Sequence, residues 1–522
     1  MSKVARATFS LMIATIIAKI LGFGREIVLA SVYGTTMYSD VYITCMNIPV
    51  VIFASIGSAL STTFIPMFFS IKEKEGEKEA LKYTNNVFNI VVILCILLSI
   101  LGLIFTENLV KIFAIGFEGE RLLIAIKFTR IIITSIIFTG LSYIMTSYLQ
   151  IKNNFTVPGL ISIPKNLIII VSILLSVKYG PYCMIWGTLI GMSVEFIFQL
   201  PFAIKNGYRY NLYINIKDKN LKKTILLICP VLIGVAANQI NIMFDRTLAS
   251  TLVEGSISAL NYANKLNTFV MGLFILSISA VVYPMLSKLS LNKDRSKFTK
   301  IIVNSINSIV LLVMPISVGA IVLANPIVKI LFERGEFDHR ATEMTAIALS
   351  MYSLGMVAYG VSDILTKVLY SLQDMKTPMI NGIVTVAINI LLNIILLKQM
   401  ELAGLAFSTS MSLVACVLLL FIELKKKIGY FGQDKIIKTG IKSFFASIIM
   451  GIITVIAHKT ILNYLSVGMV NEIIALFGSV IVGVISYGIL VVLLKIEEIE
   501  ILLDMIKSKM VGNKYYPEEN SL

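Results

Sequence analysis

The first long apolar stretch of the sequence contains a group of charged residues. Lys19, Arg25 and Glu26 lie within it, and Asp40 opens the next apolar stretch. A single charge at the centre of a bilayer costs about 3 kcal/mol on insertion scales, so these side chains should face water or one another rather than lipid. Lys19 and Arg25 are six residues apart, which places them on broadly the same side of a helix. Two cations on one side predict a lining for an anionic ligand. Pairing with neighbouring helices during assembly is the open alternative.

A second polar group lies farther along the sequence. Asp245 and Arg246 follow three amide side chains on one apolar stretch, and Lys265 lies on the next stretch. Asn389 and Asn393, one helical turn apart, occupy a later one. Oxygen donors of this kind suit a small cation such as Na⁺. Asparagines also join helices through hydrogen bonds, and Asp245 with Arg246 could be a plain ion pair, so these alternatives stay open.

The composition identifies the environment of these charges. The chain has 522 residues, of which 57% are hydrophobic and only 14% are charged, whereas globular proteins contain about 25% charged residues. These values predict an all-α integral membrane protein. The net charge of +15 would suggest nucleic-acid binding in a soluble protein. Here it reflects basic residues in the predicted loops, so we expect no nucleic-acid partner.

Fourteen apolar stretches are long enough to cross a bilayer, which takes about 20 residues in a helix. The first of them carries no cleavage signal and should remain as a helix. The amino terminus and alternate loops carry most of the basic residues, as the positive-inside rule requires of cytoplasmic segments. The sequence therefore predicts fourteen transmembrane helices with both termini in the cytoplasm.

The chain also repeats itself once, at a shift of about 220 residues. Residues 108–113 (NLVKIF) match residues 326–331 (PIVKIL), and residues 149–150 (LQ) match residues 372–373 (LQ) shortly before a proline. The shift covers six spans, so two pseudo-symmetric six-helix lobes should share one orientation and rock about a substrate site between them. A duplicated membrane scaffold without transport is the alternative. The predicted parts are an N-lobe (1–204), a cytoplasmic linker (205–223), a C-lobe (224–423), two further helices (424–494) and a cytoplasmic amphipathic tail (495–522).

Motifs for chemical catalysis are absent from the sequence. It contains no P-loop, no nucleophile elbow and no HExxH motif. The five cysteines are scattered without CxxC spacing, and the two histidines are too few for a metal site or a catalytic triad. We therefore expect a protein that is not an enzyme.

Several phrases of the sequence resemble one known family. They are residues 19–26 (KILGFGRE), 245–250 (DRTLAS), 331–338 (LFERGEFD) and 372–378 (LQDMKTP), which together extend over the first twelve predicted spans. In these phrases the chain is similar to the MurJ (MviN) family, lipid II flippases of the multidrug/oligosaccharidyl-lipid/polysaccharide (MOP) exporter superfamily. The resemblance implies that undecaprenyl-diphosphate-linked peptidoglycan precursor is translocated across the bacterial cytoplasmic membrane by alternating access.

The resemblance also implies roles for the charged residues. The diphosphate would bind Lys19, Arg25 and Lys265, while Glu26 and Asp40 would be cavity acids with a part in gating. Two of the three cations are lysines where the family has arginine, which keeps the charge but loses the bidentate fork. The family's further arginine in the second span has no counterpart in this sequence.

A sodium site is implied as well, on Asp245, Asn389, Asn393, the carbonyl of Leu405, and Thr409, with Asn393 where the family has an acid. Sodium and the membrane potential would drive transport, without another cofactor or metal. The last two helices would form a groove for the lipid tail. We expect a monomer whose partners are lipid II, membrane lipids and cell-wall synthesis proteins. A flippase for another polyprenyl-linked glycan and, in a different class, a membrane-embedded polyprenyl-sugar transferase remain the alternatives.

Overall fold

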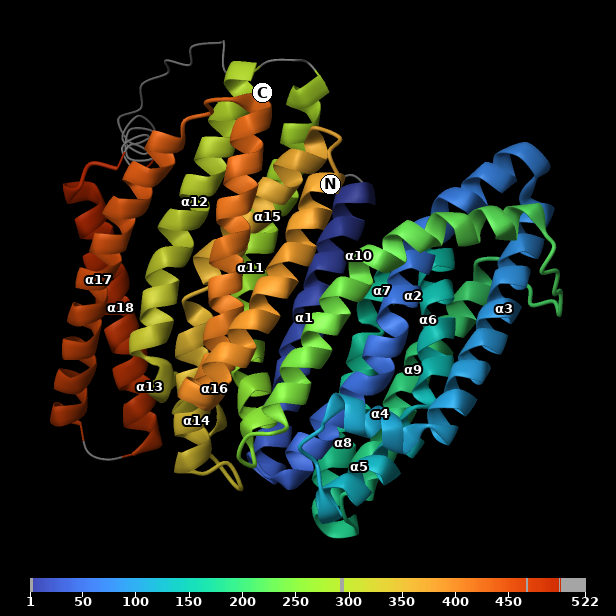
Figure 1. Cartoon of the computed structure of the whole chain (residues 1–522), viewed down its shortest axis with the longest axis horizontal. Coiled ribbons are helices and arrows are strands. Elements are labelled where there is room, and N and C mark those ends of the chain that lie inside the picture. Colours follow the sequence, from blue (N-terminus) through green and yellow to red (C-terminus); the bar gives the residue numbers. More distant parts are fainter. Residues whose placement is uncertain (1–2, 292–294, 466–467, 497, 499–522) are drawn as a thin grey trace. The chain divides into compact units, whose positions relative to one another are not determined.

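The computed structural model describes residues 3–291, 295–465, 468–496 and 498. Within these ranges the regular secondary structure is helical, without a strand (Figure 1). A segment surrounded by lipid has no water to satisfy its backbone, and a helix satisfies the N–H and C=O groups internally. The all-α class is therefore confirmed for the described ranges. The amphipathic tail predicted at 495–522 lies outside them, apart from three residues.

The helices follow the apolar stretches of the sequence. In the first part of the chain they are α1 (Lys3–Tyr33), α2 (Met37–Glu75), α3 (Glu77–Ile104), α4 (Thr106–Phe113), α5 (Gly119–Ile132), α6 (Ser135–Ile151), α7 (Thr156–Leu160), α8 (Ser162–Tyr179) and α9 (Tyr182–Lys205). In the second part they are α10 (Lys219–Ala249), α11 (Ser256–Leu291), α12 (Arg295–Val322), α13 (Ala324–Phe332), α14 (His339–Ser353), α15 (Met356–Ser371), α16 (Lys376–Ile428), α17 (Gln433–Tyr464) and α18 (Met469–Leu493).

Eleven segments of the described chain are long and apolar enough to cross a membrane. They do not include α1 and α10, each 31 residues long, which contain the first and seventh predicted spans (about 7–32 and 224–248). One of the eleven is the 53-residue α16, in which Glu401 has non-helical backbone angles (φ 47°, ψ −124°). The sequence predicts two spans in α16, at about 378–397 and 402–423, on either side of Glu401. The total of fourteen spans and the orientation of the termini stay predictions.

The predicted duplication recurs in the order of the helices. The series α2 to α6 consists of two long helices, a short one and two of intermediate length, and α11 to α15 repeat that order. The turn after each series is also the same. Asn153 and Gln373 both have a positive φ (58° and 61°). The next residues, Asn154 and Asp374, each donate a backbone hydrogen bond to the carbonyl five residues earlier.

This turn corrects the register of the repeat. The structure matches Asn153 with Gln373, a shift of 220 residues, whereas the LQ pairs at 149–150 and 372–373 differ by 223. The predicted alignment was therefore wrong by three residues at this point. A turn of this shape needs a left-handed backbone position, which Asn and Gln both adopt here, so the conformation recurs without the residue types.

The chain divides into two compact units built from discontinuous segments. The first contains Met1–Lys265, Leu331–Ala348 and Val386–Ser408, and the second contains Leu266–Ile330, Leu349–Thr385 and Thr409–Leu522. These limits differ from the predicted lobe boundaries, which stay predictions. In the first unit α2 is central, since α3, α5, α6 and α10 all pack against it.

The second unit has its own apolar core. Helix α12 packs against α15 and α17, and α17 packs against α18. Ile302, Ile306 and Ile309 of α12 and Ile364 of α15 are fully buried there. An apolar pocket of about 350 Å³ lies between α12 and α17, lined by residues that include Val318 and Gly451.

The linker between α9 and α10 is irregular, and three asparagines of α3 hold it in place. Asn85 and Asn89 donate to linker carbonyls, and Asn86 exchanges two hydrogen bonds with the backbone of Asn215. Irregular backbone cannot satisfy its own polar groups, so these side-chain amides do so. The segment predicted as a linker at 205–223 is therefore fastened to the first unit.

Asp374 provides a test of the repeated turn. Its Oδ1 accepts a hydrogen bond from the backbone N–H of Thr377 (3.0 Å), and its other oxygen pairs with Lys427. Burial opposes ionisation, but the hydrogen bonds from Lys427 and Thr377 outweigh burial and lower the pKa of Asp374 to about 2. The ion pair therefore stabilises the fold above about pH 4, and this stabilisation is lost as the pH falls towards 2.

We predict that Asp374→Ala lowers the free energy of unfolding by about 1 kcal/mol or more, because both the helix-capping contact and the ion pair are lost. Asp374→Asn should cost less, since Asn154 makes the same capping contact to Val157 (3.3 Å) in the first repeat. Thermal unfolding in detergent at neutral pH measures both. Equal losses for the two variants would contradict the capping role.

Candidate functional site

Arg25 is the centre of a charged cluster on α1. Its guanidinium pairs with the neighbouring carboxylate of Glu26 (Nη2 to Oε1, 2.6 Å) and donates to Oδ1 of Asn166 on α8 (3.3 Å). The side chain of Glu26 is 5% exposed and that of Arg25 is 18% exposed. An unpaired ion buried to this extent would cost several kcal/mol. The contact is therefore what allows both charges to remain in an apolar helix.

Asn261 extends this cluster to the helices of the second repeat. Its Nδ2 donates to Oε2 of Glu26 (3.1 Å), and its Oδ1 accepts from Nη2 of Arg246 (3.1 Å). Helices α1, α8, α10 and α11 thus contribute to one polar network within the first unit. Pairing between helices, the alternative left open for Arg25 and Glu26, is present in the structure. Any anion that binds Arg25 has to compete with this pairing.

The two predicted lysines differ from Arg25 in exposure. Lys265 lies one turn beyond Asn261 on α11 and is exposed, and it is close enough to attract Glu26 electrostatically. Lys19 is also exposed, six residues before Arg25 on α1, which is about 9 Å along the helix axis. The structure therefore brings Arg25, Glu26 and Lys265 together and places Lys19 farther along the same helix.

A further ion pair adjoins this network. Nζ of Lys165 on α8 lies 2.9 Å from Oε1 of Glu195 on α9, and their side chains are 22% and 14% exposed. Glu195 attracts Arg25 and Lys165 repels Lys265, so the pair belongs to the same charged region. Charges of both signs are present there, and the exposed Lys265 is a cation that an anion can reach without first breaking an ion pair.

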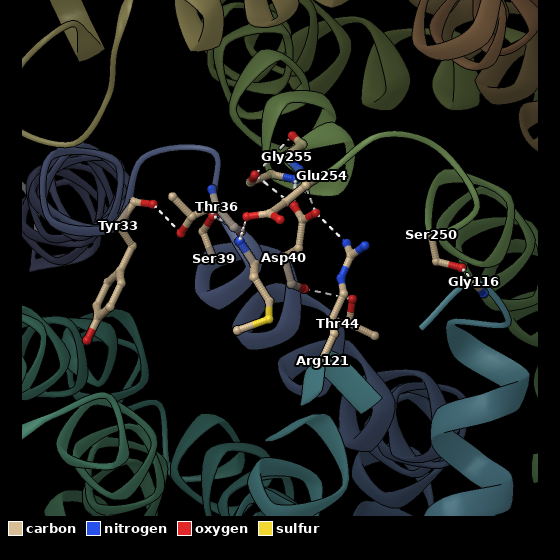
Figure 2. Close-up of polar contacts among 12 residues, drawn as sticks. Tyr33, Thr36, Ser39, Asp40, Thr44, Gly116, Arg121, Ser250, Glu254 and Gly255 are labelled. Carbon is tan, nitrogen blue, oxygen red and sulfur yellow. Dashed lines mark hydrogen bonds and ion pairs between the residues drawn. The ribbon is translucent and has the colours of Figure 1, made fainter. Parts of the chain in front are cut away.

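Asp40 forms a separate, fully buried cluster at the start of α2 (Figure 2). Its Oδ2 accepts hydrogen bonds from Nη2 of Arg121 (2.6 Å) and from the backbone N–H of Gly255 (2.9 Å). Its Oδ1 accepts from the backbone N–H and the hydroxyl of Ser258 (both 2.8 Å). Four hydrogen bonds to one carboxylate compensate for the loss of its hydration. We call Asp40 with these three partners the Asp40 latch.

The latch joins three helices. Gly255 directly precedes α11 and Ser258 is in its first turn, so the carboxylate lies at the amino terminus of α11, where free N–H groups and the helix dipole favour negative charge. Arg121 comes from α5 and stacks over the ring of Phe117, 4.1 Å from its centroid. Asp40 itself lies in the first turn of α2.

Glycines bring the neighbouring backbone segments into close contact. A Cβ atom on Gly34 would lie 2.1 Å from the carbonyl oxygen of Glu336, and one on Gly335 would lie 2.1 Å from that of Ser31. The backbone N–H of Glu336 donates to the Ser31 carbonyl (2.9 Å). Both glycines have a positive φ (54° and 61°). No other residue type fits these positions without moving the backbone.

The sequence analysis did not identify the partners of these acids. Arg121 ends a predicted external loop at about 106–121. The positive-inside bias makes basic residues rare in such loops, so its position could have indicated a structural role. Asn166, Ser258 and Asn261 carry no such signal, because amides and hydroxyls are common in transmembrane helices.

The structure also brings together part of the implied sodium site. Nδ2 of Asn393 on α16 donates to Oδ1 of Asp245 on α10 (2.6 Å) and to Oδ1 of Asn389 (3.0 Å). Leu405 is buried in the same unit, whereas Thr409 belongs to the second unit.

Apolar segments of membrane-spanning length, a repeated helix order and a charged network among the helices are the features of a multi-pass membrane transporter. The fold agrees with this class. The chain resembles a multidrug resistance MATE family transporter of the MOP superfamily in an inward-facing conformation, with a TM-score of 0.69 over 82% of this chain and 99% of the other. The identity is 13%, so this likeness concerns the fold alone.

Sequence comparison then identifies the family. The family model described as "Lipid II flippase MurJ" matches residues 29–476. A "Probable lipid II flippase MurJ" of Buchnera aphidicola subsp. Acyrthosiphon pisum is 29% identical over 487 residues, 92% of this chain and 95% of the relative. The Vibrio cholerae relative of the same description is 28% identical over 507 residues, 92% of this chain and 94% of the relative. A solved structure described as lipid II flippase MurJ in an inward closed conformation is 29% identical, with a TM-score of 0.79 over 92% of this chain and 98% of the other. The chain belongs to the lipid II flippase MurJ family.

The latch generates a stability prediction. Asp40→Ala should lower the free energy of unfolding by about 3–5 kcal/mol, because it leaves Arg121 and two helix N–H groups without their acceptor. Thermal unfolding of Asp40→Ala, Arg121→Ala and the double variant measures the coupling between the two side chains. Lys111→Ala is the control, since Lys111 forms an ion pair with Glu107 in which both side chains are more than half exposed, and little change is expected. Additive effects of the Asp40 and Arg121 variants would contradict the latch.

Proposed function

We propose that this protein is a lipid II flippase, which moves undecaprenyl-diphosphate-linked peptidoglycan precursor from the inner to the outer leaflet of the bacterial cytoplasmic membrane. The match to the family model over residues 29–476 carries this proposal. In the proposed arrangement fourteen helices span the membrane, with both termini in the cytoplasm. The protein works by transport rather than by making or breaking covalent bonds.

The charged cluster on α1 is the proposed contact for the diphosphate. A diphosphate diester carries two negative charges, so nearby cations attract it. Lys265 is exposed and can meet a phosphate directly, and Lys19 can meet another part of the headgroup. Arg25 is held by Glu26 at 2.6 Å, so a phosphate reaches it by replacing one acceptor with another. Such an exchange couples ligand arrival to a change in the packing of α1 against α11.

The Asp40 latch supplies the second element of alternating access. It holds α2, α5 and the start of α11 together through hydrogen bonds that a change of state must break. The close backbone contacts at Gly34 and Gly335 would separate in the same step. We propose that this end of the first unit is closed while the headgroup binds and opens when it leaves.

The lipid tail and the driving force complete the proposal. The apolar pocket between α12 and α17 fits a polyprenyl chain by its chemistry, since the residues around it are almost all aliphatic. The membrane potential is worth about 2.3 kcal/mol per elementary charge for each 100 mV, which is enough to bias a step that moves net charge.

The headgroup role predicts the effect of removing a cation. Arg25→Ala and Lys265→Ala should each reduce lipid II translocation in proteoliposomes by about tenfold to a hundredfold, since a hydrogen bond to a charged group contributes about 1.5–3 kcal/mol. Lys82→Ala, which removes a cation from an exposed pair with Glu79, is the control and should leave the rate unchanged. If both variants reach the membrane at normal levels and still replace the native flippase in a depleted strain, the headgroup role is wrong.

The two cations should differ in their tolerance of a conservative change. Arg25→Lys should lose activity, because a single ammonium cannot hold Glu26 and Asn166 in the planar geometry of the guanidinium. Lys265→Arg should keep the activity of the unchanged protein, since an exposed point charge is replaced by a group that offers more hydrogen bonds. The same translocation measurement tests both substitutions, and the opposite ranking would contradict the assigned roles.

A further inference from the structure

The cluster of Asp245, Asn389 and Asn393 departs from the chemistry of a cation site. These residues lie in the first unit, on α10 and α16, and Asn389 and Asn393 are 1% and 0% exposed. At the centre of the cluster is the side-chain nitrogen of Asn393. It lies 2.6 Å from Oδ1 of Asp245 and 3.0 Å from Oδ1 of Asn389.

The orientation of the Asn393 amide follows from its neighbours. Oδ1 of Asp245 is the acceptor in this contact, and the NH₂ end of the Asn393 amide is the donor that meets it. The second hydrogen of that NH₂ points to the Asn389 oxygen, which is also an acceptor. Turning the amide over would bring three side-chain oxygens together, an arrangement that needs a cation between them.

A cation such as Na⁺ requires the opposite orientation of the Asn393 amide, with its oxygen turned towards the ion. Hard cations are bound by converging oxygen lone pairs, and their positive charge compensates for the repulsion between those oxygens. In this protein the two N–H bonds of Asn393 already point at the oxygens of Asp245 and Asn389. The partial positive charge of the NH₂ group therefore takes the place of the cation.

The number of acidic residues in the cluster also bears on whether it needs a cation. An aspartate at position 393 would give two carboxylates at hydrogen-bond distance, and like charges that close require a cation or a proton. With asparagine at 393 only Asp245 is acidic, and the next residue in the chain is the cation Arg246. The single negative charge of the cluster is then attracted electrostatically by Arg246.

We propose that the amide of Asn393 replaces the sodium ion in this protein, so that this cluster does not bind Na⁺ and transport does not depend on Na⁺. This role of Asn393 rests on the proposed flippase function and excludes Na⁺ as the ion that drives transport. The membrane potential then remains as the driving force. The residue at position 393 determines whether the cluster binds Na⁺, so Asn393→Asp should make transport depend on Na⁺.

Binding of Na⁺ tests the inference without lipid II. The full-length protein in nanodiscs is unfolded thermally in NaCl and in KCl of the same ionic strength. The unchanged protein should have the same midpoint in both salts, whereas Asn393→Asp should unfold about 2 °C or more higher in NaCl, with saturation as the Na⁺ concentration rises. Asn393→Leu, which removes the amide without adding a carboxylate, should show no preference for Na⁺.

Transport provides the second measurement. Lipid II translocation in proteoliposomes under an imposed potential should be equal within twofold in Na⁺ and in K⁺ for the unchanged protein. A saturable stabilisation of the unchanged protein by Na⁺ that is lost in Asp245→Asn would overturn the inference. So would a transport rate that falls tenfold when K⁺ replaces Na⁺. An absence of translocation in both salts would instead count against the flippase function, and the binding measurement would still decide the sodium question.

Discussion

An ionised group inside an apolar helical bundle needs a partner, and this requirement organises the first unit of the protein. The Asp40 carboxylate is fully buried, and it is stable there because four hydrogen bonds from α5 and α11 reach it. Glu26 is nearly as buried and is held by Arg25 and Asn261. Removing either set of partners would leave a charge whose burial costs several kcal/mol. Each acid therefore fixes the positions of the helices that supply its partners.

The same requirement makes these contacts suitable for a transporter. A buried ion pair contributes little net stability when its geometry is intact, because desolvation offsets the attraction between the charges. In the proposed mechanism an incoming anion replaces Glu26 at Arg25, while Asn261 still donates a hydrogen bond to Glu26. An empty site with an unpaired arginine would be unstable. The exposed Lys265 has no such constraint, which is the physical reason for expecting a lysine to be sufficient there and a guanidinium to be needed at position 25.

The sequence was enough to predict the class of fold and the residues that carry charge, but not their partners. Lys19, Arg25 and Glu26 stand out because a charge in an apolar stretch is rare. Asn166 and Asn261 do not stand out, since their roles depend on contacts with Arg25 and Glu26 that lie 141 and 235 residues away in the chain. The predicted register of the repeat was wrong for a related reason. The short LQ match compares residue types, whereas the turn at Asn153 and Gln373 recurs in its backbone angles and not in its residue types.

The proposal for Asn393 illustrates how one functional group can change the kind of site that a fold contains. Carboxylate and carboxamide have nearly the same shape, so α10 and α16 can pack in the same way with either. The carboxylate adds a charge that calls for a cation, while the carboxamide supplies two N–H groups that satisfy the neighbouring oxygens from within. In the described structure those N–H groups reach Asp245 and Asn389. The proposal for Asn393 thus allows members of one family to share their helices and the proposed headgroup site while they differ in the ion that resets them.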